Sequence, residues 1–175
     1  MIDFSLDYFA LFGLPPRYTF DPATLDAAYH ALQRAVHPDR FAAAGETERR
    51  VALQSSARVN EAYQALKDPV GRAQYLLSLH GIDALAETNT ALPAEFLLHE
   101  LERREAVAEA QAASDTRGLE ALLRQVHADA DALERVLADR LEAEAWQDAR
   151  DAVRELRFLT KVAGDIEAAI AADER

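Results

Sequence analysis

The sequence predicts an all-α fold in which an N-terminal helical hairpin is followed by a C-terminal three-helix bundle. Alanine, leucine, glutamate and arginine, which are strong helix formers, are abundant, whereas clusters of β-branched residues are scarce. Apolar residues recur every three or four positions over several stretches, which is the spacing of one face of a helix. Most of these stretches are separated by short connections, and short connections favour antiparallel neighbours.

Composition limits the possible functions. The 175 residues include no cysteine, which excludes disulfides and thiolate ligation of zinc or iron–sulfur clusters by this chain. No apolar run approaches the ~20 residues that a membrane span needs. The first four residues also lack the basic start and apolar core of a signal peptide. We therefore expect a cytoplasmic protein that does not contact the membrane.

The net charge of -12 is concentrated in the second half of the chain. Residues 1–80 have a net charge of -1, and residues 81–175 have a net charge of -11. Because binding to phosphates needs a basic face, the acidic half argues against nucleic acid as a partner. The change near residue 80 also predicts a domain boundary, with a first domain at 1–81, a linker at 82–92 and a second domain at 93–175.

Four helices are expected in the first domain, at residues 8–12, 22–36, 46–67 and 70–79. Asp7 and Asp21 are suitable N-caps, and Pro22 suits the first position of a helix. Asp68-Pro69 separates the third helix from the fourth. The two long helices should pack antiparallel, with the loop after residue 36, which continues through a loop from Phe41 to Gly45, at the tip of the hairpin.

The sequence His37-Pro38-Asp39 lies in this loop, between Arg34 and Arg40. Pro38 disfavours the α-region for the residue before it, so the helix should end there. One interpretation is that these residues only form the turn, as Pro and Asp commonly do. A catalytic acid–base pair is another, but no serine or metal-ligand partner accompanies them in a recognisable arrangement. The third is a recognition site, which the two arginines could extend electrostatically.

Three helices are expected in the second domain, from Pro93 to about 113, from about 119 to 137 and from about 144 to 170, with a turn at 115–118. In the last helix, an arc of apolar side chains from Trp146 to Ala163 predicts the core face. Phe158 falls roughly opposite this arc. It should therefore either contact another helix or be an exposed anchor for a partner.

The first helix of this bundle has two different faces. Phe96, Val107 and Ala110 share one face. The other carries Leu98, Glu102, Glu105 and Glu109, with Leu97 and Leu101 at its margin. These leucines are either part of the core, with solvated glutamates beside them, or a surface for a partner protein.

Three blocks of the first domain resemble the sequence blocks of a J domain, in the same order and at suitable separations. They are Asp7–Leu14, His37–Arg40 and Val59–Pro69. The continuation, Arg72–Gly81, resembles HscB, the J-type co-chaperone of iron–sulfur cluster assembly. In the second domain, Phe96–Leu98, Leu101-Glu102, Arg104-Glu105 and Val153–Leu159 extend this resemblance. It covers nearly the whole chain.

The resemblance implies a J domain joined to a three-helix bundle, with two protein partners and no catalysis, metal or cofactor in the chain itself. The J domain would dock on the DnaK-type chaperone HscA and stimulate its ATPase through His37, Pro38 and Asp39, with Arg34 and Arg40 at the edges. The bundle would bind the scaffold IscU through contacts that comprise Leu97, Leu98, Leu101, Glu102, Glu105, Glu109 and Phe158.

Two departures from known patterns narrow the interpretation. The family usually has a more basic second helix, whereas Ala31, Leu32, Gln33 and Ala35 carry no charge here. The cysteine-rich zinc segment of eukaryotic relatives is also not present, so a bacterial-type member is expected. The alternative is a general J protein that presents unfolded clients. Such a protein would need a broad apolar groove or a Gly/Phe-rich linker, and residues 82–92 provide neither.

Overall fold

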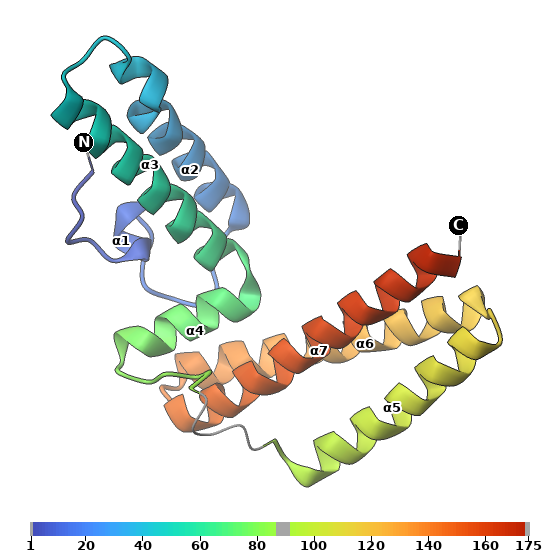
Figure 1. Cartoon of the computed structure of the whole chain (residues 1–175). Coiled ribbons are helices and arrows are strands. Elements are labelled where there is room, and N and C mark those ends of the chain that lie inside the picture. The colour runs from blue at the N-terminus through green and yellow to red at the C-terminus, as the bar shows by residue number, and fades with distance from the viewer. Residues whose placement is uncertain (1, 87–91, 174–175) are drawn as a thin grey trace. The chain divides into compact units, whose positions relative to one another are not determined.

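The computed structural model describes residues 2–86 and 92–173, and every regular element in these residues is a helix (Figure 1). The all-α prediction is therefore confirmed. The chain divides into two compact units, Met1–His80 and Gly81–Arg175. Within the predicted linker, residues 87–91 lie outside the described residues. No helix in the described part is both long and apolar enough to cross a membrane.

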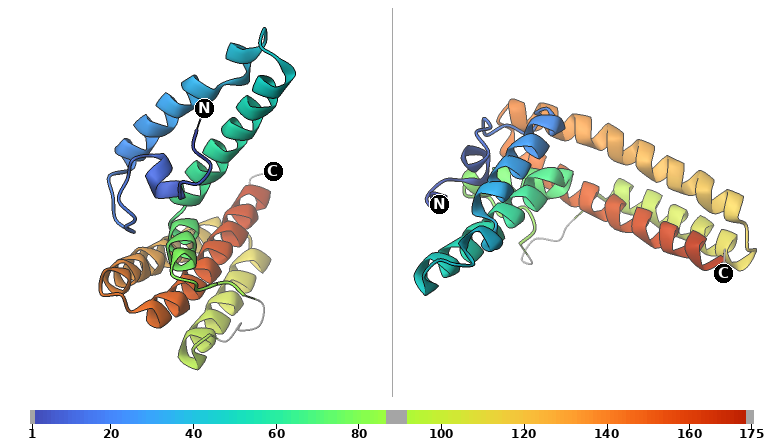
Figure 2. Two further views of the ribbon diagram at one scale, coloured as in Figure 1. Left: turned by 90° about the vertical axis from the view of Figure 1, so that its left-hand side faces the viewer. Right: turned by 90° about the horizontal axis from the view of Figure 1, so that it is seen from above.

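The first unit is a helical hairpin with shorter helices beside it. Its elements are α1 (Tyr8–Leu11), α2 (Pro22–Val36), the 3-10 helix η1 (Pro38–Phe41), α3 (Glu46–Lys67) and α4 (Pro69–Leu79). The predicted caps are confirmed, because Asp7 accepts a hydrogen bond from the Ala10 amide and Asp21 accepts one from the Ala23 amide. Figure 2 shows α2 and α3 side by side in both views.

Aromatic, polar and apolar contacts join α2 to α3. Tyr29 of α2 stacks on Tyr63 of α3 with ring centroids 3.9 Å apart. The Tyr63 hydroxyl donates to Asp26 at 2.8 Å, which adds a polar tie across the same interface. Leu25 and Leu66 are among the fully buried side chains of this unit. These contacts therefore join α2 to α3 in the part of the hairpin that lies away from the tip, where α2 gives way to η1.

The second unit contains α5 (Ala94–Ala112), α6 (Thr116–Glu142) and α7 (Trp146–Asp173). A core cluster joins α6 to α7 through Leu119, Val126, Leu159, Ala163 and Ile166. The helix α5 adds half-buried side chains to this cluster, namely Phe96, Val107 and Ala110, as its apolar spacing predicts. By contrast, Val136 of α6 is 41% exposed, whereas the adjacent Leu137 is fully buried.

The turn predicted at residues 115–118 is wrong, because α6 already begins at Thr116. Asp115 is its N-cap and accepts a hydrogen bond from the Gly118 amide at 3.0 Å. A Cβ atom at position 118 would lie 2.5 Å from the Asp115 carboxylate, so any side chain there would force this carboxylate to shift. The chain reverses earlier, at Ser114, whose φ of 49° allows the Asp115 amide to reach the Ala110 carbonyl.

Candidate partner-binding surfaces

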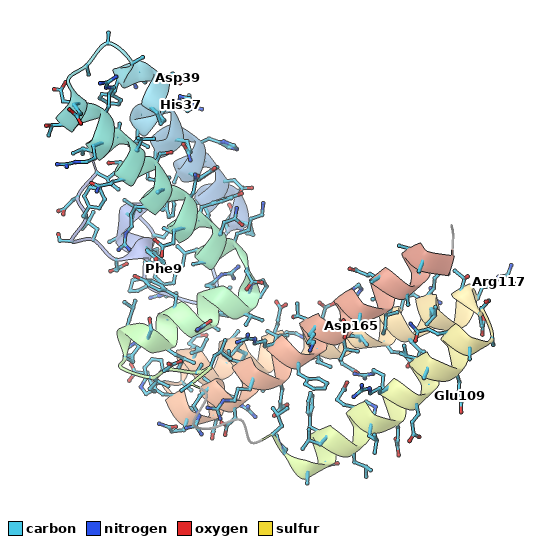
Figure 3. All side chains as sticks on the ribbon, in the orientation of Figure 1. Phe9, His37, Asp39, Glu109, Arg117 and Asp165 are labelled. Carbon is cyan, nitrogen blue, oxygen red and sulfur yellow. The ribbon has the colours of Figure 1, made fainter. Side chains whose placement is uncertain are left out.

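The tip of the α2–α3 hairpin presents His37 and Asp39 on a backbone that local hydrogen bonds hold in place (Figure 3). The Asp39 amide donates to His37 Nδ1 at 3.3 Å, so the imidazole caps the η1 helix that Pro38 opens. The Arg40 amide donates to the His37 carbonyl at 3.1 Å. Proline fixes its own φ, which further limits the conformations of this turn.

The polar side chains of the tip point into solvent. The side chain of His37 is 53% exposed and that of Asp39 is 90% exposed, with His37 Nδ1 and Asp39 Oδ2 3.5 Å apart. Val36, directly before them, is almost completely buried and anchors the end of α2. A rigid turn with exposed donors and acceptors is suited to recognition of another protein, because little conformational freedom is lost on binding.

The two arginines beside the tip have different roles in its structure. Arg40 folds back along the end of α2 and donates to the Arg34 carbonyl at 3.1 Å. It therefore helps to close the turn in addition to carrying charge. Arg34 is exposed on the last turn of α2, where a positive charge also interacts favourably with the helix dipole. This exposed position is compatible with its predicted contribution to a recognition site.

A second surface lies on α5 and consists of Leu97, Leu98, Leu101, Glu102, Glu105 and Glu109, which we call the outward face. The three leucines are 46%, 60% and 54% exposed, so they are not core residues. All three glutamates are exposed as well, and Figure 3 shows Glu109 on α5. Neighbouring exposed leucines are a feature that partner-binding surfaces share.

Phe158 of α7 contacts α5. Its ring packs edge-on against Phe96 with centroids 5.7 Å apart and an interplanar angle of 81°. Of the two predicted alternatives, the structure shows contact with another helix, and Phe158 is half-buried as a result. The other six predicted scaffold-binding residues share the outward face of α5. Phe158 is linked to this face through Phe96, which directly precedes Leu97.

The inner face of α5 contains a charged pair that the sequence reasoning missed. Glu100 and Arg103 are the buried residues of this helix, and Arg103 binds both Glu100 and Asp129 of α6. Their spacing of three residues was a visible signal, because side chains at i and i+3 lie on neighbouring positions of a helix. The apolar pattern alone could not reveal that this pair faces inward.

The first turns of α7 carry another buried charge. Arg154 donates from Nε to the Ala84 carbonyl at 2.8 Å and lies 3.5 Å from Asp151, which ties the segment around Ala84 to α7. Next to it, burial raises the pKa of Glu155, and the positive charge of Arg140 only partly opposes this rise. The ionised form of Glu155 therefore costs stability in the folded chain.

Each of the two units matches a known family model. A family model described as the DnaJ domain matches residues 7–75, and one described as the HSCB C-terminal oligomerisation domain matches residues 92–167. The co-chaperone protein HscB homolog of Burkholderia multivorans is 45% identical over 170 residues, which are 97% of each chain. The homolog of Burkholderia thailandensis shows the same identity and coverage.

Solved structures give the same result. Chaperone HscB from Vibrio cholerae matches with a TM-score of 0.84 and 37% identity, covering 93% of this chain and 96% of its own. The human co-chaperone protein HscB matches with a TM-score of 0.89 and 29% identity, covering 95% of this chain and 83% of its own. The similarity in sequence and in structure therefore extends over both units.

Proposed function

The chain belongs to the HscB family of J-domain co-chaperones, and we propose on this basis that it connects two proteins in iron–sulfur cluster assembly. The J domain docks on the DnaK-type chaperone HscA and stimulates its ATPase. The C-terminal bundle binds the scaffold IscU and delivers it to the chaperone. ATP hydrolysis takes place in the partner, whose conformational equilibrium is shifted by docking, and the family is one of co-chaperones rather than enzymes.

The hairpin tip supports the chaperone-binding part of this proposal. His37 and Asp39 are exposed while their backbone is fixed by Pro38 and by the hydrogen bonds of η1. A preorganised turn can bind without a large loss of conformational entropy. Arg34 and Arg40 place positive charge next to the turn, so an acidic partner surface would fit here.

The single observation that carries the scaffold-binding part is the outward face of α5. Three leucines, each about half exposed, lie beside three exposed glutamates on this face. A partner would cover the leucines with apolar side chains and pair basic residues with the glutamates. Phe158 contributes to this part of the proposal through its ring contact with Phe96, the residue before Leu97.

Binding measurements with purified partners test whether the two surfaces act separately. His37→Gln should abolish stimulation of the HscA ATPase and leave IscU affinity unchanged. Alanine at Leu97 and Leu101 together with Phe158→Ala should weaken IscU binding, with the J-domain activity unchanged. Loss of both activities in either variant, with the fold intact, would contradict the two-surface proposal.

A pull-down from lysate separates this proposal from the general J-protein alternative. The chain should retain HscA and IscU selectively, and adding purified IscU should not displace HscA. Recovery of many unrelated unfolded clients, with IscU no more abundant than the others, would favour a general J protein instead.

A further inference from the structure

Helix α5 buries two charged side chains and leaves three leucines exposed. Its buried residues are Glu100 and Arg103, whereas Leu97, Leu98 and Leu101 are each about half exposed. Burial of apolar surface is the main driving force of packing, so it would favour turning the leucines toward α6 and α7. The inner face also packs Phe96, Val107 and Ala110 against the core, so two partly apolar faces compete and a further interaction can decide between them.

The buried charges provide such an interaction. One terminal nitrogen of Arg103 binds Glu100 Oε1, and the other binds Asp129 Oδ2 on α6. The side chains of Arg103 and Glu100 are 4% and 3% exposed, and Asp129 remains 46% exposed. At about 100° per residue, Glu100 and Arg103 lie about 60° apart on α5, on the side roughly opposite Leu98.

Directional bonds fix the rotation of a helix more strictly than apolar contacts do. The apolar side chains on the inner face, Phe96, Val107 and Ala110, are only partly buried, and apolar contacts are not directional. The planar guanidinium of Arg103 can satisfy two carboxylates in only a narrow range of orientations. Rotation away from Asp129 would leave buried charges without compensation.

The carboxylate of Glu100 adds to the need for Arg103 to keep this orientation. Its Oε2 atom is buried and has no hydrogen-bond partner among the described residues. The neighbouring His99 lies 3.8 Å from Oε1, but its side chain is 61% exposed. Arg103 therefore provides the buried compensation for this carboxylate.

We propose that Glu100, Arg103 and Asp129 form an orientation lock that fixes the rotation of α5 and keeps its leucines available to the scaffold. The role of the leucines in this statement rests on the proposed function, but the lock itself concerns only the chain. Arg103 is thus a positioning residue, which acts on the partner through the side chains that it keeps exposed.

Cysteine labelling measures the rotation directly, because the chain contains no cysteine of its own. Ala108→Cys places a thiol at an exposed position of α5, and Ala110→Cys places one at a half-buried position on the inner face. With the lock intact, the first thiol should react about tenfold faster than the second. The ratio of the two rates then reports which face of α5 is turned inward.

The lock is removed by combining each cysteine with Glu100→Leu and Arg103→Leu. Replacement of a buried ion pair by apolar residues is often neutral or stabilising, so the thermal midpoint should be kept or raised. The labelling ratio should nevertheless fall from about ten to about two or less, because both faces of α5 are then apolar. An unchanged ratio in the folded double variant would overturn the proposal.

A charge-reversed variant tests whether the labelling ratio depends on the ion pairs that orient α5 or only on the stability of the fold. Glu100→Arg, Arg103→Glu and Asp129→Arg together restore opposite charges at every contact, and the ratio should return to within about twofold of its original value. If the double leucine variant does not fold, Asp129→Asn changes only the half-exposed member, and an unchanged ratio there would also overturn the lock.

Labelling needs no partner, so failure of the lock and failure of the proposed function give different results. A reduced ratio together with weaker IscU binding supports both. A reduced ratio with unchanged IscU affinity supports the lock and contradicts the role of the outward face. An unchanged ratio contradicts the lock whatever happens to binding.

Discussion

Replacing Leu97, Leu98 and Leu101 by alanine should weaken IscU binding on the order of a hundredfold. The three side chains are 46%, 60% and 54% exposed, so docking can remove about half of each from water. Complete burial of a leucine contributes about 1.5–3 kcal/mol, so half burial contributes roughly 1 kcal/mol per residue and roughly 3 kcal/mol in total. At about 1.4 kcal/mol for each tenfold change in Kd, this total corresponds to on the order of a hundredfold.

Isothermal titration of the variant with purified IscU measures this loss. Because the leucines are exposed, the stability of the chain should change by no more than about 0.5 kcal/mol, which a thermal melt checks. Val136→Ala is a matched control, since Val136 is an exposed apolar residue on α6 and is 41% exposed. A loss below about threefold in the folded triple variant, or an equal loss in the control, would refute the assignment of this surface.

Four further predictions address the two surfaces, the α6–α7 connection and a half-buried glutamate of α7. His37→Gln should reduce stimulation of the HscA ATPase by about thirtyfold or more, as expected for a central interface residue, while circular dichroism shows an unchanged fold. Glutamine at the three glutamates of the outward face should weaken IscU binding at low salt, and the difference from the unaltered chain should largely disappear near ~1 M salt. Glu144, at φ 56°, should stabilise the chain by up to about 1 kcal/mol when replaced by glycine, which a denaturant titration measures. Burial raises the pKa of Glu155, so the folded chain holds this proton more tightly than the unfolded chain, and stability is lost as the pH rises through the raised value. Glu155→Gln should therefore raise the thermal midpoint at neutral pH, with the gain disappearing near ~pH 4, whereas a gain independent of pH would exclude this cause.

Much of the fold could be predicted because its signals are local. Asp7, Asp21 and Asp68 are N-caps, and each accepts a hydrogen bond from an amide two or three residues later. The bounds of α3, Glu46–Lys67, follow from the glycine before it and the Asp68-Pro69 sequence after it. The turn before α6 could not be placed correctly, because Ser114 adopts a positive φ that its residue type does not suggest.

The surfaces were predictable to different extents. The outward face of α5 follows from helical spacing, and its leucines are exposed as the partner-binding interpretation requires. From the sequence, Phe158 could be predicted to lie away from the apolar face of its own helix. Its contact with Phe96 could not be predicted, because this contact depends on how two helices distant in sequence pack together. Burial of Glu100 and Arg103 was not predictable for the same reason, because the compensating carboxylate comes from Asp129 on another helix.

ATPase turnover of HscA, measured with and without IscU, tests the central claim most directly because it requires both surfaces at once. The unaltered chain should stimulate turnover on its own and stimulate it further when IscU is present. The triple alanine variant of α5 should keep the stimulation seen without IscU and lose most of the further stimulation that IscU adds. His37→Gln should lose both. Equal stimulation with and without IscU, or the same response from the triple variant as from the unaltered chain, would contradict the proposed link between scaffold and chaperone.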